Sequence, residues 1–134
     1  MQSITNIYNK ICTIQALSPE IHDYINSLPR DEYCSLATIY ILGRDGWNRY
    51  YEDTSELYSF VEEQEADGKK VTPRMLDDHF LTKEKKAEQL DTIYQYELSD
   101  AGKINHVYRH NWLSKKTDLI QIINKGLSMQ EEAR

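Results

Sequence analysis

Apolar residues at the start of the chain recur every three or four positions, which is the spacing of one face of an α-helix. The residues of this pattern are Ile4, Ile7, Tyr8, Ile11 and Ile14. We expect a first helix that ends near Leu17. Ser18 and Pro19 then provide an N-cap and a proline at the first helical position, which predicts a second, short helix. The inner face of this helix comprises Ile21, Tyr24, Ile25 and Leu28.

A third helix is predicted over roughly residues 31–42, directly after Pro29. Its first turn contains Asp31 and Glu32, which the positive end of the helix dipole favours. The rest of the segment is apolar nearly all round, so we expect this helix to run through the middle of the fold. Gly43 can adopt the left-handed conformation of a helix terminus, and we predict that the helix ends there.

The second half of the chain also has a helical pattern. Thr72 and Pro73 begin a short helix to Leu81, and Thr82 begins a longer one to Leu98. Apolar spacing indicates another helix over 104–113 and a last one, capped by Thr117, to residue 127. We expect residues 128–134 to be a frayed tail. With the acidic helix described below, these elements predict an all-α fold, with residues 1–134 forming a compact single-domain bundle of six to eight helices.

The composition indicates a folded protein of the cell interior. A chain of 134 residues can bury a core without disulfides or structural metal. Cys12 and Cys34 lie within apolar helical patterns, and we expect both thiols to be reduced and buried. No apolar run approaches the roughly 20 residues of a membrane span, and the first ten residues lack a secretory signal pattern. The predicted location is the cytoplasm.

The segment between Tyr50 and Gly68 contains seven acids and no Lys or Arg, within a chain of net charge -6. Apolar and aromatic residues are interspersed among the acids, so we predict an amphipathic helix with a face of one charge sign. Like charges three or four residues apart on a helix repel, and this cost suggests a cationic partner. The candidate partner-binding residues are Tyr50, Tyr51, Glu52, Asp53, Glu56, Tyr58, Glu62, Glu63 and Glu65.

Carboxylates spaced along a helix can imitate the phosphates of a nucleic acid. A Lys/Arg groove that binds phosphates does so largely through electrostatic attraction. Arginines that read base edges through a bidentate fork accept a carboxylate in the same way. The acidic segment therefore predicts binding to a nucleic-acid-handling protein, whereas direct contact of this acidic chain with nucleic acid is not expected.

The string from Gly46 to Tyr58 resembles the C-terminal segment of a small phage anti-CRISPR protein that inhibits a type II effector nuclease. That segment has a Gly-Trp-Asn opening, then Tyr-Glu-Asp, then Glu-x-Tyr. The resemblance implies that Tyr51, Glu52, Asp53 and Glu56 occupy the site that reads the short motif beside a DNA target. A further acid used by that inhibitor falls on Thr54 here. The resemblance covers thirteen of 134 residues.

A broader resemblance spans about residues 20–100. The segments that resemble a bacterial family of uncharacterised small helical proteins are Leu28-Pro29-Arg30-Asp31-Glu32, Leu36, Gly43-Arg44-Asp45-Gly46 and Thr72-Pro73 leading to Leu76. Gly46 stands one position later than that pattern has it. This resemblance implies a helical bacterial or phage protein and no particular activity.

A basic segment lies near the end of the chain, in contrast to the acidic middle. Residues 101–117 contain Lys103, Arg109, Lys115 and Lys116 and no acid. This basic segment can dock against the acidic helix, within the chain or in a homodimer. His106 and His110 share a helix face and could hold a metal, but residues 103–115 contain no Asp or Glu to complete the site. A metal-dependent enzyme is therefore the weakest alternative.

No catalytic signature is present in the sequence. Gly43-Arg44-Asp45-Gly46 lacks the Lys-Ser/Thr of a phosphate-binding loop, and no serine lies in a nucleophile-elbow pattern. We therefore predict a non-enzymatic acidic binding protein without a cofactor, most concretely a phage-type inhibitor of a bacterial nucleic-acid-handling complex. The alternative is a bacterial regulatory or housekeeping protein that acts through homodimer or other protein contacts.

Overall fold

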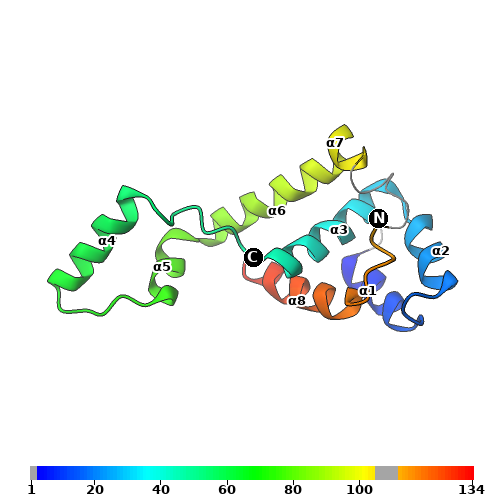
Figure 1. The fold of residues 1–134 in the computed structure, drawn as a ribbon, viewed down its shortest axis with the longest axis horizontal. Helices are drawn as coiled ribbons and strands as arrows, with labels where there is room; N and C mark the ends of the chain where they lie inside the picture. The colour runs from blue at the N-terminus through cyan, green and yellow to red at the C-terminus, as the bar shows by residue number, and fades with distance from the viewer. Residues whose placement is uncertain (1–2, 105–111) are drawn as a thin grey trace.

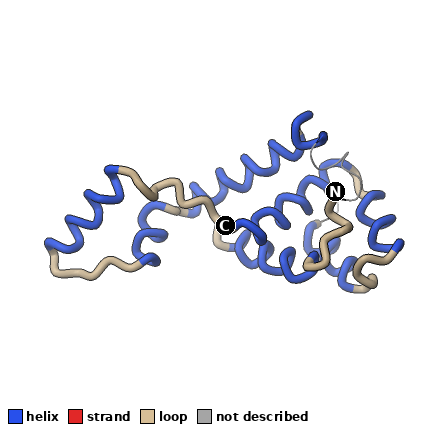
Figure 2. The backbone as a smooth tube through the Cα atoms, in the orientation of Figure 1, coloured by secondary structure: helices blue, strands red, loops and turns tan. Residues whose placement is uncertain are grey.

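The computed structural model describes residues 3–104 and 112–134, and this described part contains eight helices and no strand (Figure 1, Figure 2). The all-α class and the predicted number of helices are confirmed. In chain order the helices are α1 (Ile4–Cys12), α2 (Pro19–Ser27), α3 (Arg30–Asp45), α4 (Ser55–Ala66), α5 (Pro73–Phe80), α6 (Lys83–Leu98), α7 (Asp100–Gly102) and α8 (Leu119–Glu131). The helix predicted over 104–113 lies almost entirely outside the described residues.

Helix α3 lies at the centre of the body, as its apolar sequence predicts. It packs against α8, α6 and α1 (Figure 1). Its side chains join those of α1, α2 and α8 in the main hydrophobic core, and the fully buried members include Ile7, Ile11, Leu36 and Ile123. Removing such side chains from water is the dominant favourable contribution to folding. The core thus fixes α3 as the element from which the other segments are positioned.

The crossing of α3 and α8 depends on two glycines. A Cβ atom at Gly43 would lie 2.1 Å from the carbonyl oxygen of Ile122, and one at Gly126 would lie 2.1 Å from that of Ile39. Both distances are impossible for real atoms, so only glycine permits this approach. The prediction that α3 ends at Gly43 is therefore wrong: the helix continues to Asp45, and Gly46, with φ of 78°, follows it.

Local capping explains where most of the helices begin. The side chains of Ser18, Thr72 and Thr82 each accept a hydrogen bond from the backbone N–H three residues later, as the sequence predicts. Thr117 does not cap the last helix. The N-cap of α8 is Asp118, whose carboxylate instead accepts a hydrogen bond of 3.0 Å from the Tyr40 hydroxyl.

The first helix is shorter than predicted. It ends at Cys12 rather than near Leu17, because the backbone N–H and the hydroxyl of Thr13 both donate to the carbonyl of Lys10. These bonds satisfy the last turn. Leu17 then adopts a φ of 60°, which no α-helix contains.

Residues 50–81, which include α4 and α5, form an arm that extends from the body along the long axis of the molecule (Figure 1). A second, smaller hydrophobic cluster joins the arm to the body. Its buried members are Leu42, Trp47, Tyr51 and Leu81. Because this cluster takes residues from α3, from the following loop and from the end of α5, the arm is anchored by side-chain packing as well as by the chain itself.

The C-terminal residues lie against this same junction. Helix α8 continues to Glu131. The Glu132 carboxylate accepts a bond of 3.2 Å from Lys86 Nζ and one of 3.4 Å from the Trp47 indole, and Ala133 packs on the second cluster. The segment 128–134, expected to fray, is thus placed on the fold by specific contacts.

The two cysteines have different surroundings. Cys34 is buried, whereas Cys12 is exposed, so the expectation that both are buried is wrong for Cys12, because α1 turns this position outward at its last residue. None of the described helices has the length and apolar character needed to cross a membrane.

Candidate partner-binding arm

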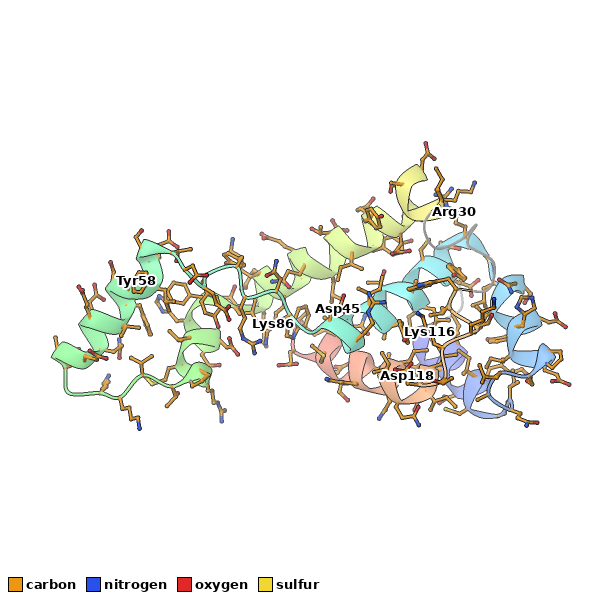
Figure 3. All side chains as sticks on the ribbon, viewed as in Figure 1. Arg30, Asp45, Tyr58, Lys86, Lys116 and Asp118 are labelled. Carbon is orange, nitrogen blue, oxygen red and sulfur yellow. The ribbon has the colours of Figure 1, made fainter. Side chains whose placement is uncertain are left out.

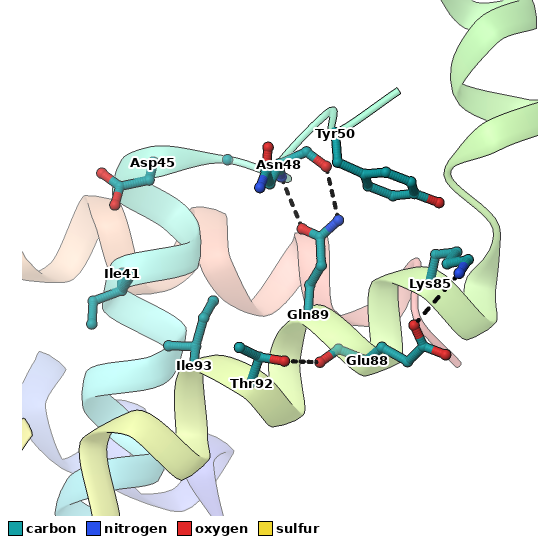
Figure 4. A pocket seen from close by; sticks show the side chains of 10 residues that line it. Ile41, Asp45, Asn48, Tyr50, Lys85, Glu88, Gln89, Thr92 and Ile93 are labelled. Atoms are coloured by element: carbon teal, nitrogen blue, oxygen red, sulfur yellow. Dashed lines mark hydrogen bonds and ion pairs between the residues drawn. The ribbon is translucent and has the colours of Figure 1, made fainter. Parts of the chain in front are cut away.

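The base of the arm is held by the side chain of Gln89 on α6. Its amide accepts a hydrogen bond from the Asn48 N–H and donates one to the Asn48 carbonyl, both at 2.8 Å (Figure 4). The Gln89 side chain thereby provides hydrogen-bond partners for both the backbone N–H and the carbonyl of Asn48, which lies in a loop outside regular secondary structure. The loop after Gly46 is consequently held to α6.

A second contact joins this loop to α5. The guanidinium of Arg49 donates two hydrogen bonds of 3.0 Å to the two carboxylate oxygens of Asp77. The Tyr51 hydroxyl donates to the same carboxylate, and the Tyr51 ring stacks on Phe80 with ring centroids 5.0 Å apart. Bidentate Arg–carboxylate pairs are among the stronger polar contacts in proteins, so Asp77 ties α5 to the loop that precedes α4.

These contacts lower the pKa of Asp77 and raise that of Tyr51. The Arg49 guanidinium holds the pKa of the Asp77 carboxyl below its usual range. Burial, together with the bond to Asp77, raises the pKa of Tyr51 to about 12. At neutral pH the carboxylate is therefore charged and the phenol is neutral, which are the two forms that the hydrogen bonds need.

The tyrosines predicted to contact a partner differ in accessibility. Tyr51 is only 3% exposed and has no surface to offer a partner, so its role is to hold the arm together. Tyr50 is 47% exposed, and its hydroxyl donates to the Phe80 carbonyl at 3.2 Å. Tyr58 is 62% exposed and points outward from α4 (Figure 3).

The acidic helix begins later than the sequence pattern suggests. Residues 50–53 form turns, with Asp53 at a φ of 64°, and Thr54 caps α4 by accepting from the Leu57 N–H at 3.3 Å. Glu52 and Asp53 thus lie on the turn before the helix. Leu57 is the residue of α4 that packs on the second cluster.

All seven acids of this segment are exposed, and none forms an ion pair with a cation among the residues that the structure describes. The acids are Glu52, Asp53, Glu56, Glu62, Glu63, Glu65 and Asp67. The arm therefore carries an excess of negative charge, since residues 50–81 contain nine acids against the three bases Lys69, Lys70 and Arg74.

The acids of α4 lie in two rows rather than on one face. With 3.6 residues per turn, Glu56 and Glu63 are close to two full turns apart and share one side of the helix. Glu62 and Glu65 share another side with Tyr58. The half-buried stripe of α4 includes Leu57, Phe60 and Val61 and runs between the two rows.

A groove separates α4 from α5. It has a volume of about 570 Å³, and its lining residues are Ser55, Glu56, Ser59, Phe60, Glu63, Gln64, His79 and Phe80. The rings of Phe60 and His79 stack with centroids 4.4 Å apart, and His79 meets Phe80 edge to face at 4.7 Å. The first row of acids thus borders a groove with aromatic walls.

A second hollow lies where the arm meets the body. It has a volume of about 550 Å³ and lies between α6, the end of α3 and the loop 46–50. Ile41 and Ile93 are among the residues that line it (Figure 4). The ammonium of Lys85 lies 3.8 Å from the Glu88 carboxylate and 5.7 Å from the centre of the Tyr50 ring. Because these charges are matched within the chain, this hollow adds no net charge to the arm.

The described residues of the basic segment lie far from the arm. Figure 3 shows Lys116 and Tyr58 well separated along the long axis, and the Lys116 ammonium lies 5.3 Å from the centre of the Trp112 ring. Docking of Lys103, Lys115 or Lys116 on the acidic helix of the same chain is therefore not found. Arg109, His106 and His110 lie outside the described residues, and no group of His, Cys, Asp or Glu within 3–104 and 112–134 could hold a metal ion.

Ser114 and Cys34 are potential nucleophiles that lie buried in the body. Ser114 Oγ lies 3.2 Å from His22 Nδ1, but Ser114 is buried and the adjoining cavity measures only about 20 Å³, which is too small for a substrate. Burial raises the pKa of the Cys34 thiol, and a thiol that stays protonated is a poor nucleophile. Both groups are therefore shielded from solvent.

Sequence reasoning did not identify Gln89, Asp77 or His79 as residues of this region. Gln89 contacts a residue 41 positions away and Asp77 contacts one 28 positions away. Such pairs follow from the tertiary fold and leave no periodic signal. His79 falls on the exposed side of α5, where only the position of α4 gives it a role.

The chain matches no protein family model, and no curated protein or solved structure is similar to it.

Proposed function

We propose that this chain is a non-enzymatic binding protein whose arm docks, through its carboxylates, on a basic groove of a bacterial nucleic-acid-handling protein. The observation that supports the proposal is the set of seven exposed acids without an intramolecular ion pair among the described residues. Neighbouring carboxylates on α4 repel by a few tenths of a kcal/mol per pair. A cationic partner would turn this cost into binding free energy and a faster, electrostatically steered association.

The most specific form of the proposal follows from the resemblance of Gly46–Tyr58 to an anti-CRISPR segment. In that form the partner is a type II effector nuclease and the arm covers the site that reads the motif beside the DNA target. Glu52, Asp53 and Glu56 would face this site, with Tyr50 and Tyr58 as apolar contacts. Tyr51 is withdrawn from this set because it is buried.

Affinity capture from a bacterial lysate tests the proposal. The bait is the wild-type chain beside a variant in which four acids of α4 are neutralised, Glu56→Gln, Glu62→Gln, Glu63→Gln and Glu65→Gln. The matched control neutralises four exposed acids elsewhere, Glu20→Gln, Asp23→Asn, Asp31→Asn and Asp91→Asn. We expect a nucleic-acid-handling protein that is retained by the wild type and the control, lost with the arm variant and released at high salt. Equal retention by all three baits would contradict the proposal.

The second candidate is a regulatory or housekeeping protein that forms a homodimer. The separation of the acidic arm from Lys116 along the long axis favours it (Figure 3), because two antiparallel copies can each place the arm on the basic residues of the other, which one chain cannot do with itself. Sedimentation equilibrium distinguishes the two. A monomer at micromolar concentration excludes the homodimer.

A further inference from the structure

The groove between α4 and α5 is lined by aromatic side chains, which suit a flat group, and by carboxylates, which suit a positively charged one. We propose that this groove binds the side chain of a single arginine of the partner protein. The inference rests on the proposed function, because it names the group that one side of the arm recognises. It assigns different roles to the two rows of acids on α4.

The aromatic wall provides the flat surface. Phe60 and His79 stack at 4.4 Å with an interplanar angle of 27°, and Phe80 closes the group at 5.5 Å from Phe60. His79 is exposed and Phe60 is half-buried, and both residues line the groove. A guanidinium is planar and weakly hydrated, and it stacks on aromatic faces more readily than an ammonium does.

The carboxylates provide the charge and the hydrogen-bond acceptors. Glu56 and Glu63 both line the groove and lie about 10 Å apart along the helix axis. Neither forms an ion pair with a cation in the described part of the chain. A carboxylate beside an open aromatic face can accept two parallel N–H bonds from a guanidinium, and the apolar stem of an arginine can lie along Phe60 and Phe80.

The same lining disfavours the other small ligands. A phosphate or other anion is repelled by two glutamates. A metal ion needs more ligands than the groove offers, since no group of three His, Cys, Asp or Glu in the described residues could hold one. A lysine would gain the charge attraction but could not make the planar stack or the bidentate bond.

Titration of the isotope-labelled full chain with N-acetyl-arginine amide, followed by NMR, tests the site. N-acetyl-lysine amide tests the planar group, and N-acetyl-citrulline amide has the shape of arginine without its charge. We expect arginine to bind most tightly, with the largest shifts at residues 55–64 and 79–80. Equal affinity for arginine and lysine, or shifts spread evenly over the arm, would overturn the inference.

Two double variants of equal charge provide the decisive comparison. Glu56→Gln/Glu63→Gln alters the groove, whereas Glu62→Gln/Glu65→Gln alters the row that does not line it. We expect the first to weaken arginine binding by about ten-fold, which corresponds to the loss of a charged hydrogen bond, and the second by less than about two-fold. His79→Ala should reduce the preference for arginine over lysine, because it removes one face of the aromatic wall. Equal effects of the two double variants would overturn the inference.

The outcomes also separate this inference from the proposed function. If the two double variants weaken arginine binding equally while neutralising α4 abolishes capture from the lysate, the arm acts through its overall charge and the groove has no special role. If arginine binds in the groove as expected but neutralising α4 leaves capture unchanged, the groove stands and the proposed function fails. Circular dichroism of each variant confirms that the helices are intact.

Discussion

Three hydrogen bonds converge on the carboxylate of Asp77. It accepts two hydrogen bonds from Arg49 and one from Tyr51, so it joins α5 to the loop before α4. Its side chain is 26% exposed, which places the pair between a solvated surface bridge and a buried one. We expect such a pair to stabilise the fold modestly and to be specific in its geometry.

This arrangement predicts a pH dependence. The pKa of Asp77 is lower in the folded chain than in the unfolded one because of Arg49. The stabilisation is therefore complete above the unfolded pKa of about 4 and is lost as pH falls through the lower, folded pKa. We expect Asp77→Asn to cost about 1 kcal/mol in the free energy of unfolding at pH 7. Urea titrations at pH 7 and pH 3 measure this difference.

The comparison of the two pH values contains its own control. At pH 3 the Asp77 carboxylate of the wild type is partly protonated and part of its stabilisation is lost. The difference in the free energy of unfolding between the wild type and Asp77→Asn should therefore be smaller than at pH 7. A difference that is the same at both pH values would mean that the charge of the carboxylate does not stabilise the arm.

At individual residues, the sequence predicts local hydrogen bonds such as helix caps, but not side-chain burial that depends on distant residues. Ser18, Thr72 and Thr82 cap the helices they were predicted to cap, because a cap bonds to a backbone N–H only three residues away. Tyr51 was predicted to face a partner and is instead buried. Its orientation depends on Asp77 and Phe80, which the fold brings close and which local pattern cannot reveal.

At the scale of elements, the crossing of α3 and α8 is a contact that a single added methyl group would disrupt. Gly43 and Gly126 have backbone atoms of the opposite helix where their Cβ atoms would be. Backbone cannot move aside as a flexible side chain can, so the two helices would have to separate. The same contact explains why Gly43, read from the sequence as a helix end, lies inside α3.

We predict that Gly126→Ala lowers the free energy of unfolding by about 2 kcal/mol or more, as overpacking in a core does. The matched control is Asn124→Ala on the exposed side of the same helix, which should change stability by less than about 0.5 kcal/mol. Thermal and urea unfolding measure both. A neutral Gly126→Ala would show that the helices cross less closely than described.

The loop between α3 and α4 depends on another contact between elements, the amide of Gln89. Gln89→Ala removes both hydrogen bonds to Asn48 while α6 itself remains intact. We expect the Asn48 amide to exchange with solvent about five- to ten-fold faster, which corresponds to about 1 kcal/mol for a hydrogen bond. Amide exchange followed by NMR measures this, and Thr92→Ala on the same helix provides the control. Unchanged protection of the Asn48 amide would show that Gln89 does not hold the loop in place.

At the scale of the whole molecule, the fold divides its contacts between two hydrophobic clusters, one in the body and one at the base of the arm. Apolar periodicity predicted the helices of both. It could not predict that α4 leaves the body, because α4 has the same amphipathic pattern as a helix that packs on a core, yet none of its residues is buried. The position of a helix in the fold depends on its tertiary contacts, which the local sequence pattern does not predict.

The proposed function likewise belongs to the whole molecule, because it depends on where the fold places its charge. The sequence shows where the acids lie along the chain. The structure adds that all seven are exposed, that four of them form two rows on α4, and that α4 lies far from Lys116 (Figure 3). An arm of this kind should compete with nucleic acid for the partner that it binds.

Displacement of nucleic acid from the captured partner measures this competition directly. A fluorescent DNA or RNA oligonucleotide is bound to the purified partner, and the chain is added at several salt concentrations. We expect the wild type and the variant neutralised at Glu20, Asp23, Asp31 and Asp91 to release the oligonucleotide, less effectively as salt increases, and the variant neutralised on α4 to leave it bound. A ternary complex in which chain and oligonucleotide bind together would contradict competition between the arm and nucleic acid.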